Sequence, residues 1–151
     1  MIRSFSFFLA VLVAGGLIGA VSQAADVTVR AINGKTGHPL VGYPIEVYAK
    51  DRVLYPHEHI HLLAKADAGS DGTAAFHLDQ PLPEALYIYI GKAGRTIGCT
   101  RNALFSIDEV LRSGVVGNNR CDPEDKIKLR FPAKAGEVVL FARKKTFLDS
   151  L

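Results

Sequence analysis

Alternation of apolar and polar residues with a period of two is the feature that most restricts the fold of this chain. It recurs in residues 26–33, 43–50 and 86–92. The apolar positions of these segments are Val27, Val29 and Ala31; Ile45, Val47 and Ala49; and Leu86, Ile88 and Ile90. Such alternation is typical of strands with one buried face. We therefore expect three strands whose polar residues face outward.

Further strands are expected at residues 72–79, 126–131 and 137–144. In the second of these, "KIKLRF", Ile127, Leu129 and Phe131 alternate with basic residues and should face inward. Turn sequences such as Asn33-Gly34 and Asp71-Gly72 separate the segments. Short strands with this punctuation predict a mainly β protein, an antiparallel β-sandwich.

One short helix is expected in residues 106–114, "SIDEVLRSG". Ser106 with Glu109 three residues later forms a capping-box pattern, and Gly114 is a C-terminal stop. Ile107, Val110 and Leu111 form its apolar stripe, which should pack on the core. A helical turn is also expected near the C-terminus, with Phe147 and Leu148 packed on the sandwich.

Residues 1–24 have the pattern of a secretory signal peptide. Arg3 precedes an apolar run, and Ser22 and Ala24 occupy the positions that a cleavage site requires. The run is shorter than the ~20 residues needed to span a bilayer. We expect cleavage to leave residues 25–151 as one domain without a membrane span, secreted or periplasmic.

The charge balance argues against a nucleic-acid partner. The formal net charge is +3, and removing residues 1–24 takes away only Arg3. The C-terminal end is mildly basic, which we interpret as a solvated strand face. Its basic residues are Lys126, Lys128, Arg130, Arg143, Lys144 and Lys145.

Cys99 and Cys121 are the two cysteines of the chain. An isolated pair in an exported protein predicts a disulfide, and the alternative of a reactive thiol lacks a CxxC spacing. A bridge over a loop of this length should stabilise the fold by ~3 kcal/mol. It would also tie down the excursion that carries the helix.

The order of turns and strands in residues 26–94 resembles the transthyretin-like, or carboxypeptidase regulatory-like, superfamily. A first strand meets a Thr-Gly-x-Pro-Leu turn at residues 36–40, then the strand "PIEV", an Asp-x-x-x-Asp-Gly turn at residues 67–72 and an Ala-x-Phe strand. The resemblance implies a Greek-key, immunoglobulin-like sandwich. From Cys99 onward the chain resembles an extended form found in small exported bacterial proteins of unassigned function.

Two enzyme families of similar fold differ from this chain at their reactive positions. Transthyretin-like hydroxyisourate hydrolases use a first-strand histidine and a Tyr-Arg-Gly-Ser tail, whereas this chain has "VTVRAIN" and "KKTFLDSL". Intradiol dioxygenases hold iron with a His-x-His pair placed after the Asp-Gly turn. Here His59 and His61 precede Asp71-Gly72. A transthyretin-like hydrolase therefore remains only a second alternative.

Histidines at every second position, His57, His59 and His61, raise the question of a metal site. On a strand they would share one face, and two imidazoles can bind zinc or copper. Another ligand would have to come from His77, His38 or Glu58. The competing interpretation makes the histidines a solvated face, with Ile60 and Leu62 pointing inward and no cofactor.

The favoured hypothesis is a non-enzymatic binding or accessory module whose ligand is unknown. Tyr48, Tyr87 and Tyr89 are its candidate contacts for a protein or carbohydrate partner, although they also fit ordinary strand aromatics. The alternative is a zinc or copper protein built on the histidine cluster. Sequence leaves the oligomeric state open, since edge strands can pair with another copy.

Overall fold

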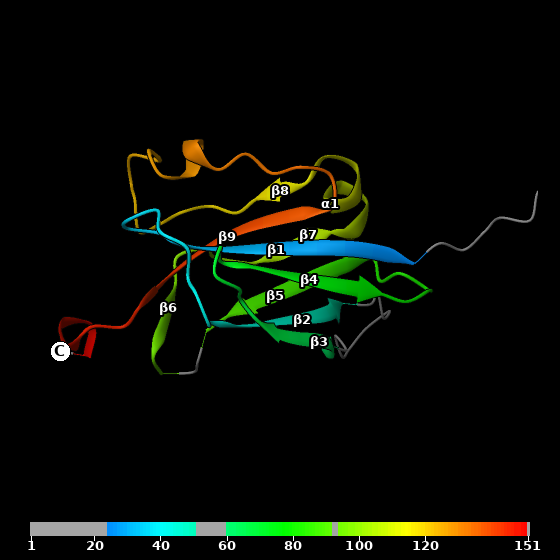
Figure 1. Cartoon of the computed structure of the whole chain (residues 1–151), viewed down its shortest axis with the longest axis horizontal. Coiled ribbons are helices and arrows are strands. Elements are labelled where there is room, and N and C mark those ends of the chain that lie inside the picture. The colour runs from blue at the N-terminus through cyan, green and yellow to red at the C-terminus, as the bar shows by residue number, and fades with distance from the viewer. Residues whose placement is uncertain (1–23, 51–59, 92–93, 151) are drawn as a thin grey trace, which may run out of the picture.

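Two β-sheets face each other across a shared apolar core (Figure 1). The computed structural model describes residues 24–50, 60–91 and 94–150, so the predicted leader lies outside it except for Ala24. The five-stranded sheet comprises β4 (Thr73–Leu78), β1 (Ala25–Asn33), β9 (Glu137–Lys144), β6 (Thr96–Gly98) and β8 (Val115–Val116). The four-stranded sheet has the order β3 (Ile60–Asp67), β2 (Pro44–Lys50), β5 (Ala85–Ile90) and β7 (Leu104–Ser106). The predicted mainly β class is confirmed.

The two sheets differ in strand direction. Every neighbouring pair of the four-stranded sheet is antiparallel. In the five-stranded sheet, β1 pairs antiparallel with β4 but parallel with β9, and β8 also runs parallel to β9. The predicted β-sandwich is therefore confirmed, with one antiparallel sheet and one sheet of mixed strand direction.

The alternating segments form strands with the predicted faces. All nine apolar residues expected to face inward in β1, β2 and β5 are at most 7% exposed and belong to the core or its border. Period-two alternation turns the polar residues of the same strands outward. Local pattern and tertiary packing therefore agree in this half of the molecule.

Helix α1 (Ile107–Ser113) lies where the sequence predicts it and packs on the core through Ile107 and Val110. Gly114 ends it with φ 73°, and a Cβ there would overlap the carbonyl of Lys134. The capping-box expectation is wrong, because the Ser106 side chain makes no cap hydrogen bond. Ser106 is instead the last residue of β7, paired with Ala85 of β5.

A second, smaller core lies on the outer face of the five-stranded sheet. Residues 117–135, here called the cover, lie over this face and bring Ile127 against Val139 and Phe141 of β9. Phe131 of the cover meets Phe141 edge-on, with ring centroids 6.5 Å apart. The strand β9 is therefore buried on both faces from Glu137 to Ala142.

Two further contacts fix the cover. Cys99 and Cys121 form the predicted disulfide, with an S–S distance of 2.02 Å. The buried amide of Asn119 donates to the Gly34 carbonyl at 2.8 Å, and its oxygen accepts from the Cys121 amide at 3.1 Å. A buried amide with both ends satisfied adds specificity to apolar packing.

The expected strand at residues 126–131 is wrong. This part of the cover forms the 3-10 helix η1 (Lys128–Arg130), and Leu129 is 82% exposed. The Ile127 amide donates to the Asp122 carboxylate at 2.6 Å, which turns the chain and inserts Ile127 into the second core. Local polar bonds have overridden a short alternating pattern.

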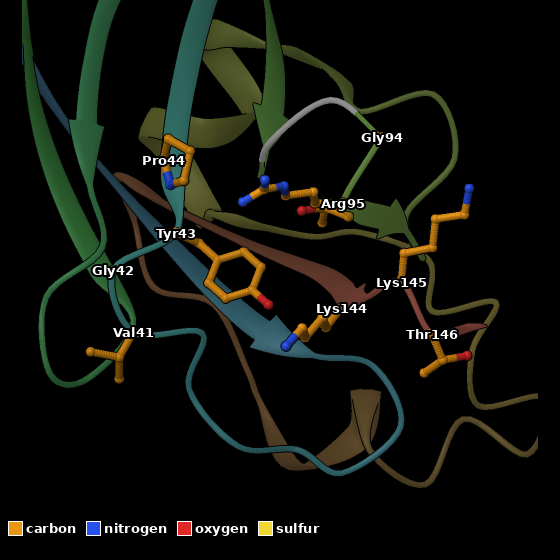
Figure 2. A pocket seen from close by; sticks show the side chains of 10 residues that line it. Val41, Gly42, Tyr43, Pro44, Gly94, Arg95, Lys144, Lys145 and Thr146 are labelled. Carbon is orange, nitrogen blue, oxygen red and sulfur yellow. The ribbon is translucent and has the colours of Figure 1, made fainter. Parts of the chain in front are cut away.

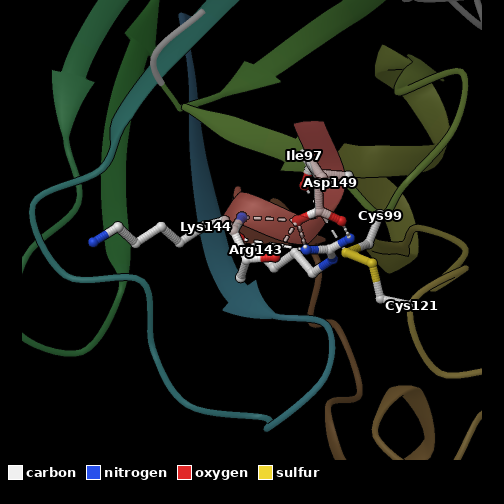
Figure 3. Close-up of polar contacts among 7 residues, drawn as sticks. Ile97, Cys99, Cys121, Arg143, Lys144 and Asp149 are labelled. Atoms are coloured by element: carbon white, nitrogen blue, oxygen red, sulfur yellow. Dashed lines mark hydrogen bonds and ion pairs between the residues drawn. A yellow bond between two sulfur atoms is a disulfide. The ribbon is translucent and has the colours of Figure 1, made fainter. Parts of the chain in front are cut away.

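The expected C-terminal turn exists as the 3-10 helix η2 (Phe147–Ser150), but Leu148 does not pack on the sandwich and is 78% exposed. An ion pair holds the turn instead: both Arg143 terminal nitrogens donate to the Asp149 carboxylate, at 2.6 and 2.5 Å (Figure 3). Among residues 24–50, 60–91 and 94–150, no helix has the length and apolar character required to cross a bilayer.

Candidate functional site

The three candidate tyrosines lie together on the outer face of the four-stranded sheet. Tyr48 of β2 is the direct cross-strand neighbour of Tyr87 on β5, with ring centroids 6.3 Å apart and planes tilted by 54°. Tyr89 follows Tyr87 two residues later, so it points to the same side of the sheet. With Glu46 and Ile60, these tyrosines line a shallow depression of about 290 Å³.

Apolar side chains extend this cluster over the whole width of the sheet. Leu62 of β3 pairs with Tyr48, and Leu104 of β7 pairs with Tyr87. The resulting row, Leu62, Tyr48, Tyr87 and Leu104, crosses all four strands; with Ile60 and Tyr89 we call it the tyrosine face. Leu62 is 51% exposed and Leu104 39% exposed. Contiguous exposed apolar side chains often mark an interaction surface.

A β-bulge places Ile60 and Leu62 on this face. Val47 pairs with Ala64 and Tyr48 with Leu62, so Leu63 has no opposite residue in β2. One extra residue reverses the side to which the following side chains point. The expectation that Ile60 and Leu62 point inward is therefore wrong: both are about half exposed, while Ala64 and Ala66 pack against the core.

A polar network borders the tyrosine face. The Tyr48 hydroxyl donates to Glu46 at 2.7 Å, and the Lys65 ammonium donates to the other Glu46 oxygen at 2.5 Å. The bonds from Lys65 and Tyr48 lower the pKa of Glu46, and the bond to Glu46 raises the pKa of Tyr48. Glu46 therefore stays ionised near neutral pH, so the network suits hydrogen bonding and positioning better than proton transfer.

The candidate metal ligands are only partly described. His57 and His59 lie outside the described residues, while His61 pairs with Ala49 across β2 and β3. His77 lies on β4 of the other sheet, where its Nδ1 lies 2.8 Å from the carboxylate of Asp26, its cross-strand neighbour. This contact raises the pKa of His77. Within the described ranges no three His, Cys, Asp or Glu side chains gather as a metal site. The metal hypothesis stays a prediction.

A larger pocket, here called the basic pocket, opens at the C-terminal end of β9. It has a volume of about 610 Å³, and its described lining contains Arg95, Lys144 and Lys145 together with Tyr43 (Figure 2). Sequence reasoning treated the last lysines as a solvated strand face and did not single out Arg95. The available signal was the Lys144-Lys145 pair at the end of an apolar strand, but the segments that meet it are distant in sequence.

Chemically, the tyrosine face offers apolar contact and hydroxyl groups, whereas the basic pocket offers positive charge beside an aromatic ring. Comparison with known proteins gives no assignment: no protein-family model, no curated protein and no solved structure matches the chain. The resemblance to transthyretin-like sandwiches therefore stays a prediction from the sequence.

Proposed function

We propose that the protein is an exported, non-enzymatic binding module that docks a partner protein on its tyrosine face. The observation that carries this proposal is the row Leu62, Tyr48, Tyr87 and Leu104, which runs across all four strands with its side chains exposed or half-buried. Tyrosines at the centre of an apolar patch with charged neighbours are the usual composition of a protein interface.

Leucines at both ends of the row favour a protein over a carbohydrate. A sugar can be bound by aromatic rings and hydrogen bonds, but it gains little from exposed Leu62 and Leu104. An apolar protein surface would cover these side chains and remove their area from water. The Glu46–Lys65 pair at the border would remain in contact with solvent, as the polar rim of an interface does.

The shape of the surface also favours a protein. Its depression of about 290 Å³ lies just below the range of about 300–1,000 Å³ usual for small-molecule sites. The rings of Tyr48 and Tyr87 lie on a strand surface and not at the bottom of a cleft. A broad partner surface fits such a face better than a small ligand does.

Export is the other part of the proposal. The leader pattern of residues 1–24 and the Cys99–Cys121 disulfide both suit an oxidising compartment outside the cytosol. If this is correct, the N-terminal residue of the exported protein should be Ala25. Detection of the intact leader on purified exported protein would contradict it.

Site-specific photocrosslinking in the native compartment tests the docking face. A photoreactive phenylalanine analogue at Tyr87 or Leu104 should produce one discrete protein adduct, which Tyr48→Ala should weaken. The same analogue at Leu129, which is 82% exposed on the cover, is the matched control and should give none.

Three outcomes would overturn docking of a different partner protein on this face. Equal adducts from positions 87 and 129 would show that exposure alone produces capture. Retention on immobilised polysaccharide that is lost in Tyr87→Ala, without a protein adduct, would make the ligand a carbohydrate. An adduct of twice the chain mass would make the partner a second copy.

A further inference from the structure

The basic pocket shares no lining residue with the tyrosine face, so its occupant is a separate question. Its described lining comes from three segments: residues 41–44 at the start of β2, residues 94–96 at the start of β6, and residues 144–146 at the end of β9. Its volume of about 610 Å³ lies within the range of about 300–1,000 Å³ typical of small-molecule sites.

Backbone hydrogen bonds fix the walls of this pocket before any ligand arrives. The Lys145 amide donates to the Arg95 carbonyl at 2.8 Å, and Lys144 pairs with Thr96 in the β6–β9 ladder. On the opposite wall, the Tyr43 carbonyl accepts from the Ala68 amide at 2.9 Å. Binding there requires little ordering of the main chain, which favours affinity.

The described lining carries three cations and no acidic residue. Arg95 and Lys144 are exposed and Lys145 is half-buried, so all three charges are accessible from solvent. No described carboxylate pairs with these side chains. Like charges held near one another on a fixed frame produce a positive potential that an anion can neutralise.

The nearest acid of the C-terminal turn is occupied. Asp149 accepts both terminal nitrogens of Arg143, and it also accepts the amide and hydroxyl of Thr146 at 2.7 and 2.8 Å. These contacts hold its pKa well below the ordinary carboxyl value. The carboxylate therefore remains ionised but bound to Arg143, and it also fixes Thr146 at the pocket wall.

Opposite the cations lies an apolar wall. Figure 2 shows the Tyr43 ring with Arg95 to one side and Lys144 to the other, while Lys145 is directed away at the rim. Val41 and Pro44 continue the apolar side. A ligand that satisfies both walls needs an apolar body and a compact group with more than one negative charge.

We propose that the basic pocket binds a small organic phosphate, with its phosphate held by Arg95 and Lys144 and its apolar part against Tyr43. The planar guanidinium donates two parallel hydrogen bonds to phosphate oxygens, and lysine adds a point charge. A phosphate dianion matches several cations better than a single carboxylate does.

Calorimetric titration of the residue 25–151 protein with phenyl phosphate tests the proposal. Phenol, which lacks the charge, and inorganic phosphate, which lacks the ring, are the matched probes, and both should bind more weakly than phenyl phosphate. Arg95→Gln and Lys144→Gln should each weaken phenyl phosphate binding about tenfold, the effect of losing one charge-assisted contact. Added salt should weaken it further, because the charges are accessible to solvent.

Lys134→Gln is the control variant. It removes the same charge from an exposed lysine just before β9, at the opposite end of that strand from the pocket, and should leave the affinity unchanged. Amide chemical shifts of Tyr43 and Thr146 should move on titration of the unmodified protein, which tests the site without any substitution. Equal losses in Lys134→Gln and Arg95→Gln would show nonspecific charge attraction and overturn the proposal.

A second arm separates a free phosphate compound from a lipid headgroup. Vesicles of phosphatidylcholine with and without phosphatidic acid should bind the protein equally weakly if the ligand is a small soluble phosphate. Capture by phosphatidic acid vesicles without binding of phenyl phosphate would overturn the small-ligand assignment. None of these results depends on the tyrosine face, so failure here is distinguishable from failure of the proposed function.

Discussion

The outer faces of the two sheets differ in whether their apolar side chains are shielded from water. On the five-stranded sheet, the apolar outward residues Ile32, Val139 and Phe141 are at most 1% exposed because the cover lies over them. Where that sheet is bare, at its β4 edge, its outward residues are polar, as with Asp26 and His77. The four-stranded sheet carries an apolar row across its outward side, yet Leu62 and Leu104 in that row remain exposed.

The difference separates folding from binding. A sheet in water normally carries polar residues where nothing covers it, and the five-stranded sheet follows this rule at Asp26 and His77. The tyrosine face departs from it. Its exposed side chains therefore contribute less to folding than buried side chains of the same kind would. A partner that covers them would remove their apolar area from water.

The prediction with the largest expected effect compares the loss of one aromatic residue from each face. Phe141→Ala should lower the free energy of unfolding by ~3–5 kcal/mol, because it removes a fully buried ring and leaves a cavity. Tyr87→Ala should cost only ~1 kcal/mol, since Tyr87 is 36% exposed and chiefly loses its contact with Tyr48. Urea unfolding monitored by circular dichroism measures both. Equal losses would remove the distinction between the faces.

The next largest loss of stability is expected on removal of the disulfide. Replacing Cys99 and Cys121 together with alanine should lower stability by ~3 kcal/mol, because the unfolded chain regains the freedom that the bridge removes. Hydrogen exchange should show that protection is lost first in the cover, near Asn119 and Ile127, and last in β2 and β5. Simultaneous loss in both sheets would show that the cover is not a separate unit. The tyrosine-face adduct should persist in this variant at low temperature.

The smallest effect concerns the Arg143–Asp149 pair, which continues the covered side of β9 in charged form. The pKa of Asp149 is lower in the folded protein than its ordinary value of 3.8, so the pair stabilises the fold above that pH. This contribution is lost as the pH falls through the lower, folded-state value. Asp149→Asn should therefore destabilise the protein near neutral pH and make little difference in strong acid. Urea titrations at both extremes measure the difference.

A constant difference between Asp149→Asn and the unmodified protein at every pH would contradict an ionic role. Lys126→Gln is a suitable control for that series. Its ion pair with Glu124 is largely exposed, so its removal should change stability very little at any pH.

Strict alternation made β1, β2 and β5 predictable to the level of individual faces. The strand β9 was predicted in position, but "EVVLFA" has no alternation, and only the cover explains why both of its faces are buried. In β3 the doublet Leu62-Leu63 breaks the period where the bulge occurs. A doublet is a weak signal, because it does not indicate which of the two residues is extra.

The candidate sites were predictable to different degrees. The tyrosines were identified because alternation places Tyr87 and Tyr89 opposite buried residues, whereas the leucines beside them come from strand register, which one sequence does not reveal. The basic pocket depends on backbone pairing between Arg95 and Lys145, fifty positions apart. Contacts of that kind are set by tertiary structure and leave no local pattern.

The parallel pairing of β1 with β9 governs the order in which the molecule can assemble. Residues 25–33 take their place between β4 and a strand that begins only at residue 137, so a nascent chain holds an open strand edge until β9 has been synthesised. Such an edge is prone to pair with other chains. A chain of this topology gains from staying extended until its C-terminal strand is available, a condition that passage through a narrow membrane channel would also impose.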